Sequence, residues 1–412
     1  MGQGRTRSRG LTRPGGDIGR PAAGDTPERS GPLRGLRIVE LAGIGPGPFC
    51  AMMLADMGAD VVRVDRASFA AGGPDPGGVP QGILHRSRRS VGIDLKHPDG
   101  VETLLGLVAG SDGLLEGYRP GVAERLGFGP QPCHERNPRL VYGRMTGWGQ
   151  SGPLAHTAGH DINYLGLAGL LAHLGTAGGP PIVPLPLIGD FAGGAMFLAF
   201  GMVCALLEAS RSGLGQVVDA AVLDGAASLG TVYHGLRADG LWSEERGTNF
   251  NDGGSHYYNI YECSDGQHIT LGSYEPAFYA ELLRRLGMDD DPRLPDQHDP
   301  AAWPSMKQRL STLFKTRTRA QWCELLEGTD VCFAPVLSLT EAPLHPHNVA
   351  RGTFLACAGV TQPAPAPRFS RTPGAVQNTP AGPGEHTDEV LHSWLGLTTS
   401  RITELRETGA IA

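Results

Sequence analysis

The sequence lacks the patterns that mark several common classes of protein. Its seven cysteines are odd in number and include no C-x-x-C pair, so neither a disulfide framework nor a zinc ribbon is expected, and a reducing cytoplasm is the simplest location. The 35 basic and 42 acidic residues leave no positive excess to attract nucleic acid or anionic lipid. There is no P-loop, no H-E-x-x-H and no G-x-S-x-G, so metal and serine chemistry are not expected.

One apolar stretch bears on whether the chain meets a membrane. Residues 191–207 carry no charge, but three glycines interrupt them, and Asp190 and Glu208 bracket them. A membrane span needs about 20 apolar residues, so we expect a helix buried against a neighbour and no membrane partner. Residues 1–31 are rich in arginine, glycine and proline and have no apolar run like that of a signal peptide, which predicts a disordered tail.

Alternating strand and helix signals predict an α/β domain. A short apolar strand at residues 36–41 runs into a glycine-rich turn, a helix with methionines at helical spacing follows, and residues 61–65 form a second strand. This is a βαβ unit, and its continuation predicts a parallel sheet covered by helices. The further strands are expected at residues 91–95, 114–115, 140–146 and 216–219, with another helix at residues 101–109.

The second half of the chain changes character. Beyond about residue 246, short alternating segments such as residues 257–261 and 268–271 indicate a smaller unit richer in β-structure. We therefore divide the chain into four parts. These are the tail at 1–31, a large domain at 32–225 that residues 350–412 complete, a linker at 226–250 and a small α+β domain at 251–349.

The glycine turn at residues 43–48 imitates a dinucleotide-binding fingerprint, because Asp65 lies near the end of the second strand. The spacing of its glycines does not fit, and Pro46 and Pro48 remove two N–H donors from the turn that would hold a pyrophosphate. NAD binding is therefore not favoured.

Several arginines near the expected carboxyl-terminal edge of the sheet suggest a nucleotide handle. Such an edge commonly holds phosphorylated ligands. Tyr118 and Arg119 after the strand at 114–115 add a flat ring and a guanidinium. A solvated basic face is the alternative for each of these arginines. The other members of the group are Arg63, Arg66, Arg86, Arg88 and Arg89.

The strongest catalytic candidates lie at residues 159–164, where His160 and Asp161 open an expected helix. A histidine titrates near neutrality, and the free N–H groups at a helix start can stabilise an oxygen that gains negative charge. Asp190, which precedes the next helix, offers a second proton acceptor. Each of these residues also has a purely structural explanation. The histidine could be structural, and the aspartates could act only as capping or first-turn residues of the helices. Glu275, before a later helix, has the same structural explanation.

Long motifs in a fixed order then resemble a known family. Residues 33–66 contain the run E-L-A-G-I-G-P-G-P-F-C-A-M-M-L-A-D-M-G-A-D-V-V-R-V-D-R, residues 144–150 read R-M-T-G-W-G-Q, and residues 159–164 read G-H-D-I-N-Y. Together they resemble the family III CoA-transferases, specifically the alpha-methylacyl-CoA racemase branch, over nearly everything from residue 32. Shorter matches lie at residues 93–96, 189–191, 215–219, 252–254 and 275–276.

The resemblance implies a 2-methylacyl-CoA substrate whose α-carbon is inverted through an enolate, without a metal or organic cofactor. His160 and Asp190 would be the two bases, Glu275 would support His160, and the backbone N–H of Asp161 would hold the thioester oxygen. Coenzyme A, which enters as part of the substrate, would bind to the large domain. By the same resemblance its contacts would be Arg66, Ile93, Asp94, Leu95, Lys96, Arg119, Gly159, Ile162, Asn163 and Tyr164.

The implied architecture is a Rossmann-like large domain with a parallel sheet and a smaller α+β domain, in two chains interlocked as a homodimer. Each active site would lie between the large domain of one chain and the small domain of the other. Residues 249–256 read N-F-N-D-G-G-S-H where racemases resemble N-M-L-D-G-G-A-P, and Ser273 and Tyr274 replace small and aliphatic residues. We expect these departures to alter acyl-chain preference rather than proton chemistry. The loop at residues 71–82 has no assigned role.

The main alternative is transfer of CoA between carboxylic acids, in which the carboxylate of Asp161 would attack the thioester. The fold cannot separate the two reactions. The presence of His160 beside Asp161, together with Asp190 and Glu275, suits deprotonation and is not required for transfer. This combination favours the racemase.

Overall fold

The computed structural model describes residues 29–73 and 82–412, and its large domain is built on a six-stranded sheet. All strand pairs are parallel, in the order β3-β2-β1-β4-β5-β6, which confirms the predicted parallel sheet. The order reverses between β1 and β4, where ligands commonly bind in such sheets. The strands are β1 (Arg37–Leu41), β2 (Asp60–Arg66), β3 (Arg89–Ile93), β4 (Gly113–Glu116), β5 (Val141–Thr146) and β6 (Val217–Ala221).

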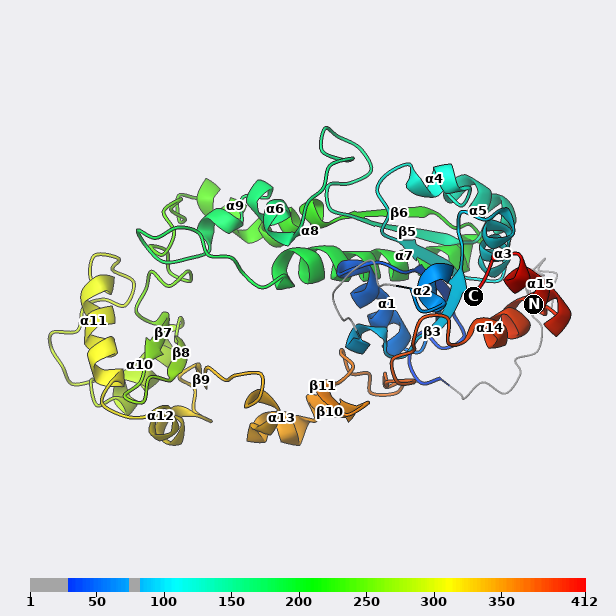
Figure 1. Ribbon diagram of the computed structural model, residues 1–412. Coiled ribbons are helices and arrows are strands. Elements are labelled where there is room, and N and C mark those ends of the chain that lie inside the picture. The colour runs from blue at the N-terminus through cyan, green and yellow to red at the C-terminus, as the bar shows by residue number, and fades with distance from the viewer. Residues whose placement is uncertain (1–28, 74–81) are drawn as a thin grey trace, which may run out of the picture.

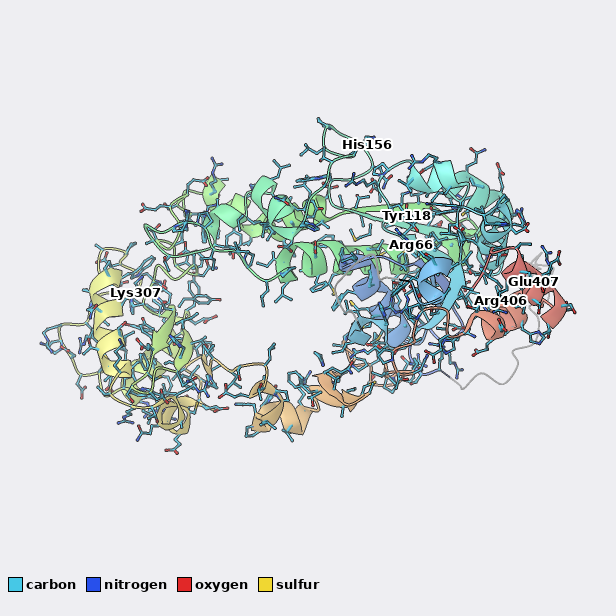
Figure 2. All side chains as sticks on the ribbon, viewed as in Figure 1. Arg66, Tyr118, His156, Lys307, Arg406 and Glu407 are labelled. Atoms are coloured by element: carbon cyan, nitrogen blue, oxygen red, sulfur yellow. The ribbon has the colours of Figure 1, made fainter. Side chains whose placement is uncertain are left out.

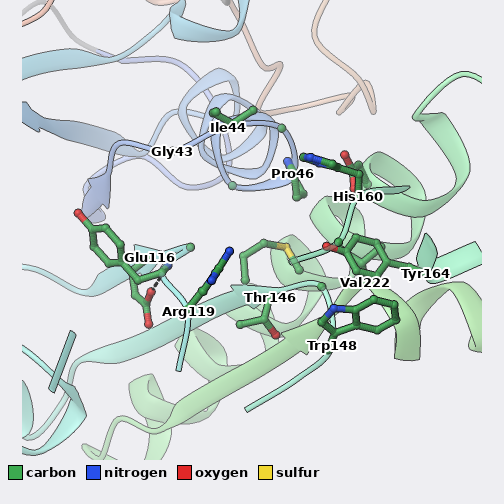
Figure 3. Close-up of a pocket in the computed structure, with 18 of the residues that line it drawn as sticks. Gly43, Ile44, Pro46, Glu116, Arg119, Thr146, Trp148, His160, Tyr164 and Val222 are labelled. Atoms are coloured by element: carbon green, nitrogen blue, oxygen red, sulfur yellow. Dashed lines mark hydrogen bonds between the residues drawn. The ribbon is translucent and has the colours of Figure 1, made fainter. Parts of the chain in front are cut away.

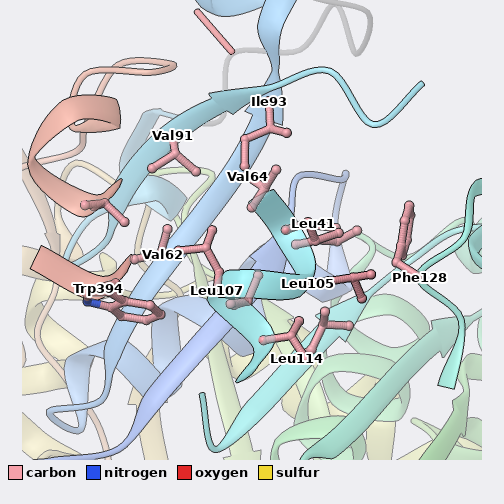
Figure 4. Packing of buried hydrophobic residues seen from close by; sticks show 14 of the residues in the cluster. Leu41, Val62, Val64, Val91, Ile93, Leu105, Leu107, Leu114, Phe128 and Trp394 are labelled. Atoms are coloured by element: carbon pink, nitrogen blue, oxygen red, sulfur yellow. The ribbon is translucent and has the colours of Figure 1, made fainter. Parts of the chain in front are cut away.

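Successive strand residues face opposite layers of helices, as the period of a strand requires. Ile38 of β1 packs against the face covered by α1 (Pro46–Asp56) and α7 (Phe197–Ser212). Val39, the next residue, joins the cluster on the other face, which Figure 4 shows from close by. Three helices supply that second layer, namely α3 (Pro98–Ala109) and the C-terminal α14 (Thr387–Leu395) and α15 (Thr399–Glu407). The end of the chain thus completes the large domain.

The third strand begins two residues earlier than expected. Its first residue, Arg89, is 5% exposed and forms an ion pair with Asp60 of the neighbouring β2 at 2.6 Å. Asp94 leaves the strand because its N–H donates to the carbonyl of Ala410. Neither partner is visible from the local apolar pattern, which therefore placed the strand too late.

Four of the arginines expected to form a nucleotide handle are buried in ion pairs instead. Burial of a charge is tolerated when a partner and further hydrogen bonds satisfy it. These arginines stabilise the large domain through ion pairs. For them, both predictions, nucleotide binding and exposure to solvent, are therefore wrong. The pairs are Arg63–Asp65, Arg86–Asp56, Arg88–Glu40 and Arg89–Asp60.

The small domain has a three-stranded antiparallel sheet with an aromatic core, as the β-rich pattern predicted. Tyr261, Phe314 and Trp322 are buried in that core. Its elements are β7 (Tyr258–Glu262), β8 (His268–Gly272), β9 (Phe333–Pro335), α10 (Pro276–Arg285), α11 (Trp303–Phe314) and α12 (Arg319–Leu326).

Two connections join the domains, so the chain forms an open ring in Figure 1, and the side chains in Figure 2 leave its centre free. One connection contains α6 (Asp161–Leu167), α8 (Val222–Leu229) and α9 (Thr231–Ala238). The other returns through η4 (Ala342–Leu344), α13 (Pro346–Arg351), β10 (Phe354–Cys357) and β11 (Val360–Pro363). The remaining short elements are α2 (Ala67–Ala70), η1 (Gly82–His85), α4 (Val122–Leu126), α5 (Pro130–Arg136) and η2 (Leu171–His173).

A π-helical segment, η3 (Leu187–Met196), continues directly into α7. By length and composition alone, the stretch Leu187–Ser212 could cross a membrane, and 39% of its apolar window is buried. Met202 lies on the sheet side and is fully buried, whereas Phe200 is 71% exposed. The expectation of a buried helix therefore holds for one face only.

Two expected loops lie mainly outside the described residues. Of the predicted tail at 1–31, the structure describes the last three residues, where the guanidinium of Arg29 donates to the carbonyls of Ala59 and Ser87 at 3.1 Å. Of the loop at 71–82, residues 74–81 lie outside the described ranges.

Candidate active site

A cavity of about 370 Å³ opens at the carboxyl ends of β1, β4 and β5, where the strand order reverses. Three loops form its walls, as Figure 3 shows: the glycine turn at 43–48, the turn at 116–120 and the segment at 155–160. A cavity at this edge follows from the topology, because the loops leaving parallel strands meet there.

The glycine turn serves to start a helix close to the cavity. Gly45 has a φ of 71°, and Pro46 occupies the first position of α1, where a missing N–H costs nothing. A Cβ on Gly45 would lie 3.4 Å from the carboxylate of Asp190. The turn therefore lies against the second predicted base, and its prolines suit a helix start rather than a pyrophosphate.

His160 is the N-cap of α6, and its imidazole is exposed at the cavity (Figure 3). Its backbone is extended, and its N–H donates to Oδ1 of Asn163 at 2.9 Å, which closes the first helical turn. This bond fixes the backbone of His160, while its ring lines the cavity. His160 is therefore not a buried structural histidine.

Tyr164 fixes the start of α6 over the sheet. Its ring meets Trp148 edge-on at a centroid distance of 4.7 Å. A Cβ on Gly147 would collide with the Tyr164 ring, and one on Gly159 would lie 2.8 Å from it. Because Gly147 and Gly159 have no Cβ, the Tyr164 ring can pack closely against them. This packing positions the start of α6, where His160 lies.

Asp161 directs its carboxylate away from the cavity. The residue is 3% exposed, and its Oδ2 accepts the backbone N–H of Asp190 at 2.8 Å. Gly189 makes this contact possible, because a Cβ there would lie 2.5 Å from the same oxygen. The other carboxylate oxygen is buried without a hydrogen-bond partner in the described part of the chain. The first N–H of α6 belongs to this residue, and such groups have no acceptor within the helix.

Asp190 lies inside the first turn of η3 and lines the cavity, so the explanation of Asp190 as a capping residue is wrong. π-helical turns are rare in proteins, and those that occur are often found at functional sites. The pKa of Asp190 is raised to about 6, chiefly by burial and also by the nearby charge of Asp161, while His160 opposes both. Close packing supports this segment, since a Cβ on Gly225 of α8 would collide with the carbonyl of Gly193.

Glu275 is not brought to this cavity within one chain. It is the N-cap of α10 in the small domain and is exposed. Figure 1 shows α10 across the opening of the ring from the large domain. Its predicted support of His160 therefore requires a small domain other than the one attached to the same His160.

The predicted coenzyme A contacts divide into two groups. Arg119, Gly159 and Tyr164 line the cavity, whereas Ile162 and Asn163 lie beyond its lining on α6. Arg66 is exposed at the end of β2 and pairs in register with Ile93, so the segment at 93–96 adjoins it on the same edge of the sheet. Within that segment, Ile93 is buried and the N–H of Lys96 donates to Asp94 at 2.9 Å.

Sequence reasoning missed Glu116 and Trp148, which also line the cavity. Glu116 is the last residue of β4, directly before the turn that carries Arg119, and this position was the available signal. Burial raises its pKa to about 7, although the N–H of Tyr118 and the charge of Arg144 lower it.

The altered loop at residues 249–256 belongs to the small domain. Ser255 and His256 are fully buried; the serine hydroxyl donates to a carbonyl of the same loop at 2.6 Å, and Nε2 of the histidine lies 2.8 Å from the hydroxyl of Tyr279. Burial lowers the pKa of His256 to about 4. The Ser255 hydroxyl and Nε2 of His256 thus have partners within the small domain, whereas Nδ1 of His256 is buried without one among the described residues. Both side chains are buried, so Tyr274, 43% exposed, is the departure best placed to meet a ligand.

The sequence of the chain is similar to a known protein family and to characterised members of it. A family model described as CoA-transferase family III matches residues 33–387. Alpha-methylacyl-CoA racemase from Mus musculus is 44% identical over 376 residues, which are 90% of this chain and 96% of that protein. The protein of the same name from Homo sapiens is 43% identical over 88% of this chain and 93% of its own length.

The fold comparison agrees. The crystal structure of a CAIB/BAIF family protein from Brucella suis matches with a TM-score of 0.75 at 24% identity, over 89% of this chain and 100% of that chain. The family model and the racemase identities extend over nearly the whole described chain, and the order of motifs noted in the sequence agrees with both. The chain therefore belongs to the CoA-transferase family III, within its alpha-methylacyl-CoA racemase branch.

Proposed function

We propose that this chain interconverts the two α-epimers of 2-methyl-branched acyl-CoA thioesters by proton transfer through an enolate. The observation that carries the proposal is the pair of proton acceptors at one cavity: His160 at the start of α6 and Asp190 in the first turn of η3. They come from two separate helices, so they can approach one carbon from different directions. The racemases at 43–44% identity support the choice of substrate.

Each group has a defined task in this reaction. One base removes the α-proton, and the other delivers a proton to the opposite face, which inverts the carbon. The thioester oxygen gains negative charge in between, and the free N–H of Asp161 at the helix start would stabilise it, an effect worth about 3 kcal/mol for one donor. Arg119 would hold the coenzyme A part at the wall of the cavity. No cofactor is needed, because the thioester itself acidifies the α-carbon.

The transferase mechanism fits the same cavity less well. It needs the carboxylate of Asp161 as a nucleophile, but this carboxylate is buried and bonded to the N–H of Asp190. An attacking oxygen must reach the thioester carbon, and the side chain would first have to break that bond and turn toward the cavity. The position of Asp161 thus favours its backbone role.

A deuterium experiment tests the proposal. A 2-methylacyl-CoA of single configuration is incubated with the protein in D₂O without an acceptor acid. We expect deuterium at the α-carbon together with loss of optical purity, since the returning proton comes from exchanged bases. Absence of both over several chain lengths, with CoA transfer once an acid is added, would establish the transferase instead.

We also propose that a second copy of the chain completes the site by interlocking with the first. Glu275 lies outside the cavity of its own chain, and large apolar side chains are exposed on both sides of the ring's opening. A flat membrane cannot cover apolar residues on both sides of the opening at once. A second chain that passes through the opening can cover both sides. Exposed residues on the η3–α7 side are Met196, Phe200, Val203 and Leu207, and on the α13 side Leu339, Leu344 and Val349.

Replacing Phe200 with glutamate tests this assembly. Its ring is 71% exposed in a single chain, so the charge is harmless to a monomer but would be buried in the proposed dimer. We expect light scattering to give twice the chain mass for the unaltered protein and a shift toward monomer, with lost activity, for the variant. Glutamate at Arg211, an exposed position of the same helix, serves as the matched control. A monomeric unaltered protein with full activity, or one that partitions into lipid vesicles, would contradict the proposal.

A further inference from the structure

A buried ion pair at the cavity wall has no part in the proposed proton transfer. Glu116 ends β4 and is 4% exposed, and Arg144 lies opposite it in register on β5 and is 8% exposed. Nε of Arg144 lies 3.4 Å from Oε1 of Glu116. Glu116 belongs to the lining of the cavity, and Figure 3 draws the hydrogen bond that its carboxylate makes with the following turn.

Glu116 closes the turn that carries Arg119. Its Oε2 accepts the backbone N–H of Tyr118 at 2.6 Å, so the side chain bridges to its own turn two residues later. A carboxylate acceptor makes such a bond about twice as strong as a neutral one. Arg119 follows at once and points into the cavity (Figure 3). Glu116 therefore fixes the backbone of the residue directly before Arg119.

Arg144 extends this contact to both sides of the cavity. One terminal nitrogen donates to Glu124 on α4, the helix that follows the Arg119 turn, and the other donates to Oε1 of Gln150 at 2.8 Å. Gln150 begins the loop that leads to His160. A planar guanidinium with several fixed donors can hold these segments at once, which a lysine cannot.

We propose that Glu116 and Arg144 are positioning residues for coenzyme A binding, which fix the turn presenting Arg119 and tie it to the loop that leads to His160. The inference rests on the proposed function in taking coenzyme A as the ligand of Arg119. It adds two residues that act through others and that touch neither reacting carbon nor base.

The charge state of Glu116 makes the arrangement sensitive to pH. The pKa of Glu116 is raised to about 7, chiefly by burial; the charges of Glu124 and Asp219 act in the same direction, and the N–H of Tyr118 and the charge of Arg144 oppose them. Above pH 7 the ionised carboxylate holds the turn through its charged hydrogen bond. Below pH 7 it is protonated, the bond weakens, and affinity for coenzyme A should fall.

The test measures binding of free coenzyme A by calorimetry at pH 6 and pH 8, so it needs no turnover. Glu116→Gln keeps the shape and removes the charge; at pH 8 we expect about tenfold weaker binding, the loss typical of one charged hydrogen bond. The part of the pH dependence that Glu116 causes should vanish in this variant. Arg144→Lys keeps the positive charge but removes the planar guanidinium and its several donors, so it should weaken binding to a similar extent. Glu102→Gln, in an exposed pair with Arg136, is the control and should bind as the unaltered protein does.

A double-mutant cycle separates positioning from general stability. If Glu116 acts through Arg119, then Glu116→Gln added to Arg119→Ala should weaken binding no further than Arg119→Ala alone. Additive losses, or unaltered binding by Glu116→Gln at both pH values, would overturn the inference. Failure of α-deuteration in the unaltered protein would remove the proposed reaction but would leave this binding result standing.

Discussion

Replacing His160 with alanine should stop racemisation and leave affinity for free coenzyme A within about threefold. The imidazole is exposed at the cavity, and its removal takes away one of two bases without disturbing the helix start, which Asn163 closes through the backbone of residue 160. General-base participation is typically worth ~10² to 10⁴ in rate, so loss of inversion should fall in or beyond this range.

The stereochemistry gives a sharper expectation than the rate. Without His160, Asp190 can still remove the α-proton of the one epimer that faces it and return a deuteron to the same side. That epimer should exchange in D₂O with retention, and the other should not exchange. Proton NMR of the α-position, combined with chiral separation of the released acids, measures both outcomes.

His156→Ala is the matched control for this prediction. His156, labelled in Figure 2, lies on the same segment as His160 and is exposed, but it is absent from the cavity lining. Its removal should change neither exchange nor inversion. Full racemisation by His160→Ala would contradict the assignment of His160 as a base.

The sequence predicted the architecture because the information needed for it is local. Apolar strands, glycine turns and helical spacing follow one another, and β1, β2, β4 and β5 lie within a residue or two of their expected bounds. Ion pairs between distant segments carry no local signal. Arg86 looks cationic in the sequence, yet it meets Asp56, 30 positions away, and both are buried.

The site was predictable to a similar extent. The adjacent His160 and Asp161 at a helix start marked the cavity, but spacing alone could not show that the His160 side chain lines it and that the Asp161 side chain turns inward. That difference depends on Gly189, whose missing Cβ lets the Asp161 carboxylate approach the N–H of Asp190. Contacts across helices of this kind become visible only in three dimensions.

Asp190→Asn should have the second large effect, with loss of inversion by a similar ~10² to 10⁴. The amide keeps the size of the side chain and cannot accept the α-proton. Exchange with retention should now survive for the epimer opposite to the one that survives in His160→Ala. Chiral separation of both variants, run on both epimers, checks this complementarity; the same surviving epimer in both would contradict a two-base mechanism.

The pH dependence of Asp190 links it to Asp161. A base must be ionised, so the rate for the epimer that Asp190 deprotonates should rise with pH through about 6, the value to which burial and the charge of Asp161 raise its pKa. Asp161→Asn removes that charge but keeps an oxygen to accept the N–H of Asp190, so the inflection should move to lower pH while racemisation continues. A transferase that uses the Asp161 carboxylate as its nucleophile would instead lose its activity entirely in this variant, and the pH profile of Asp161→Asn therefore decides between the two reactions.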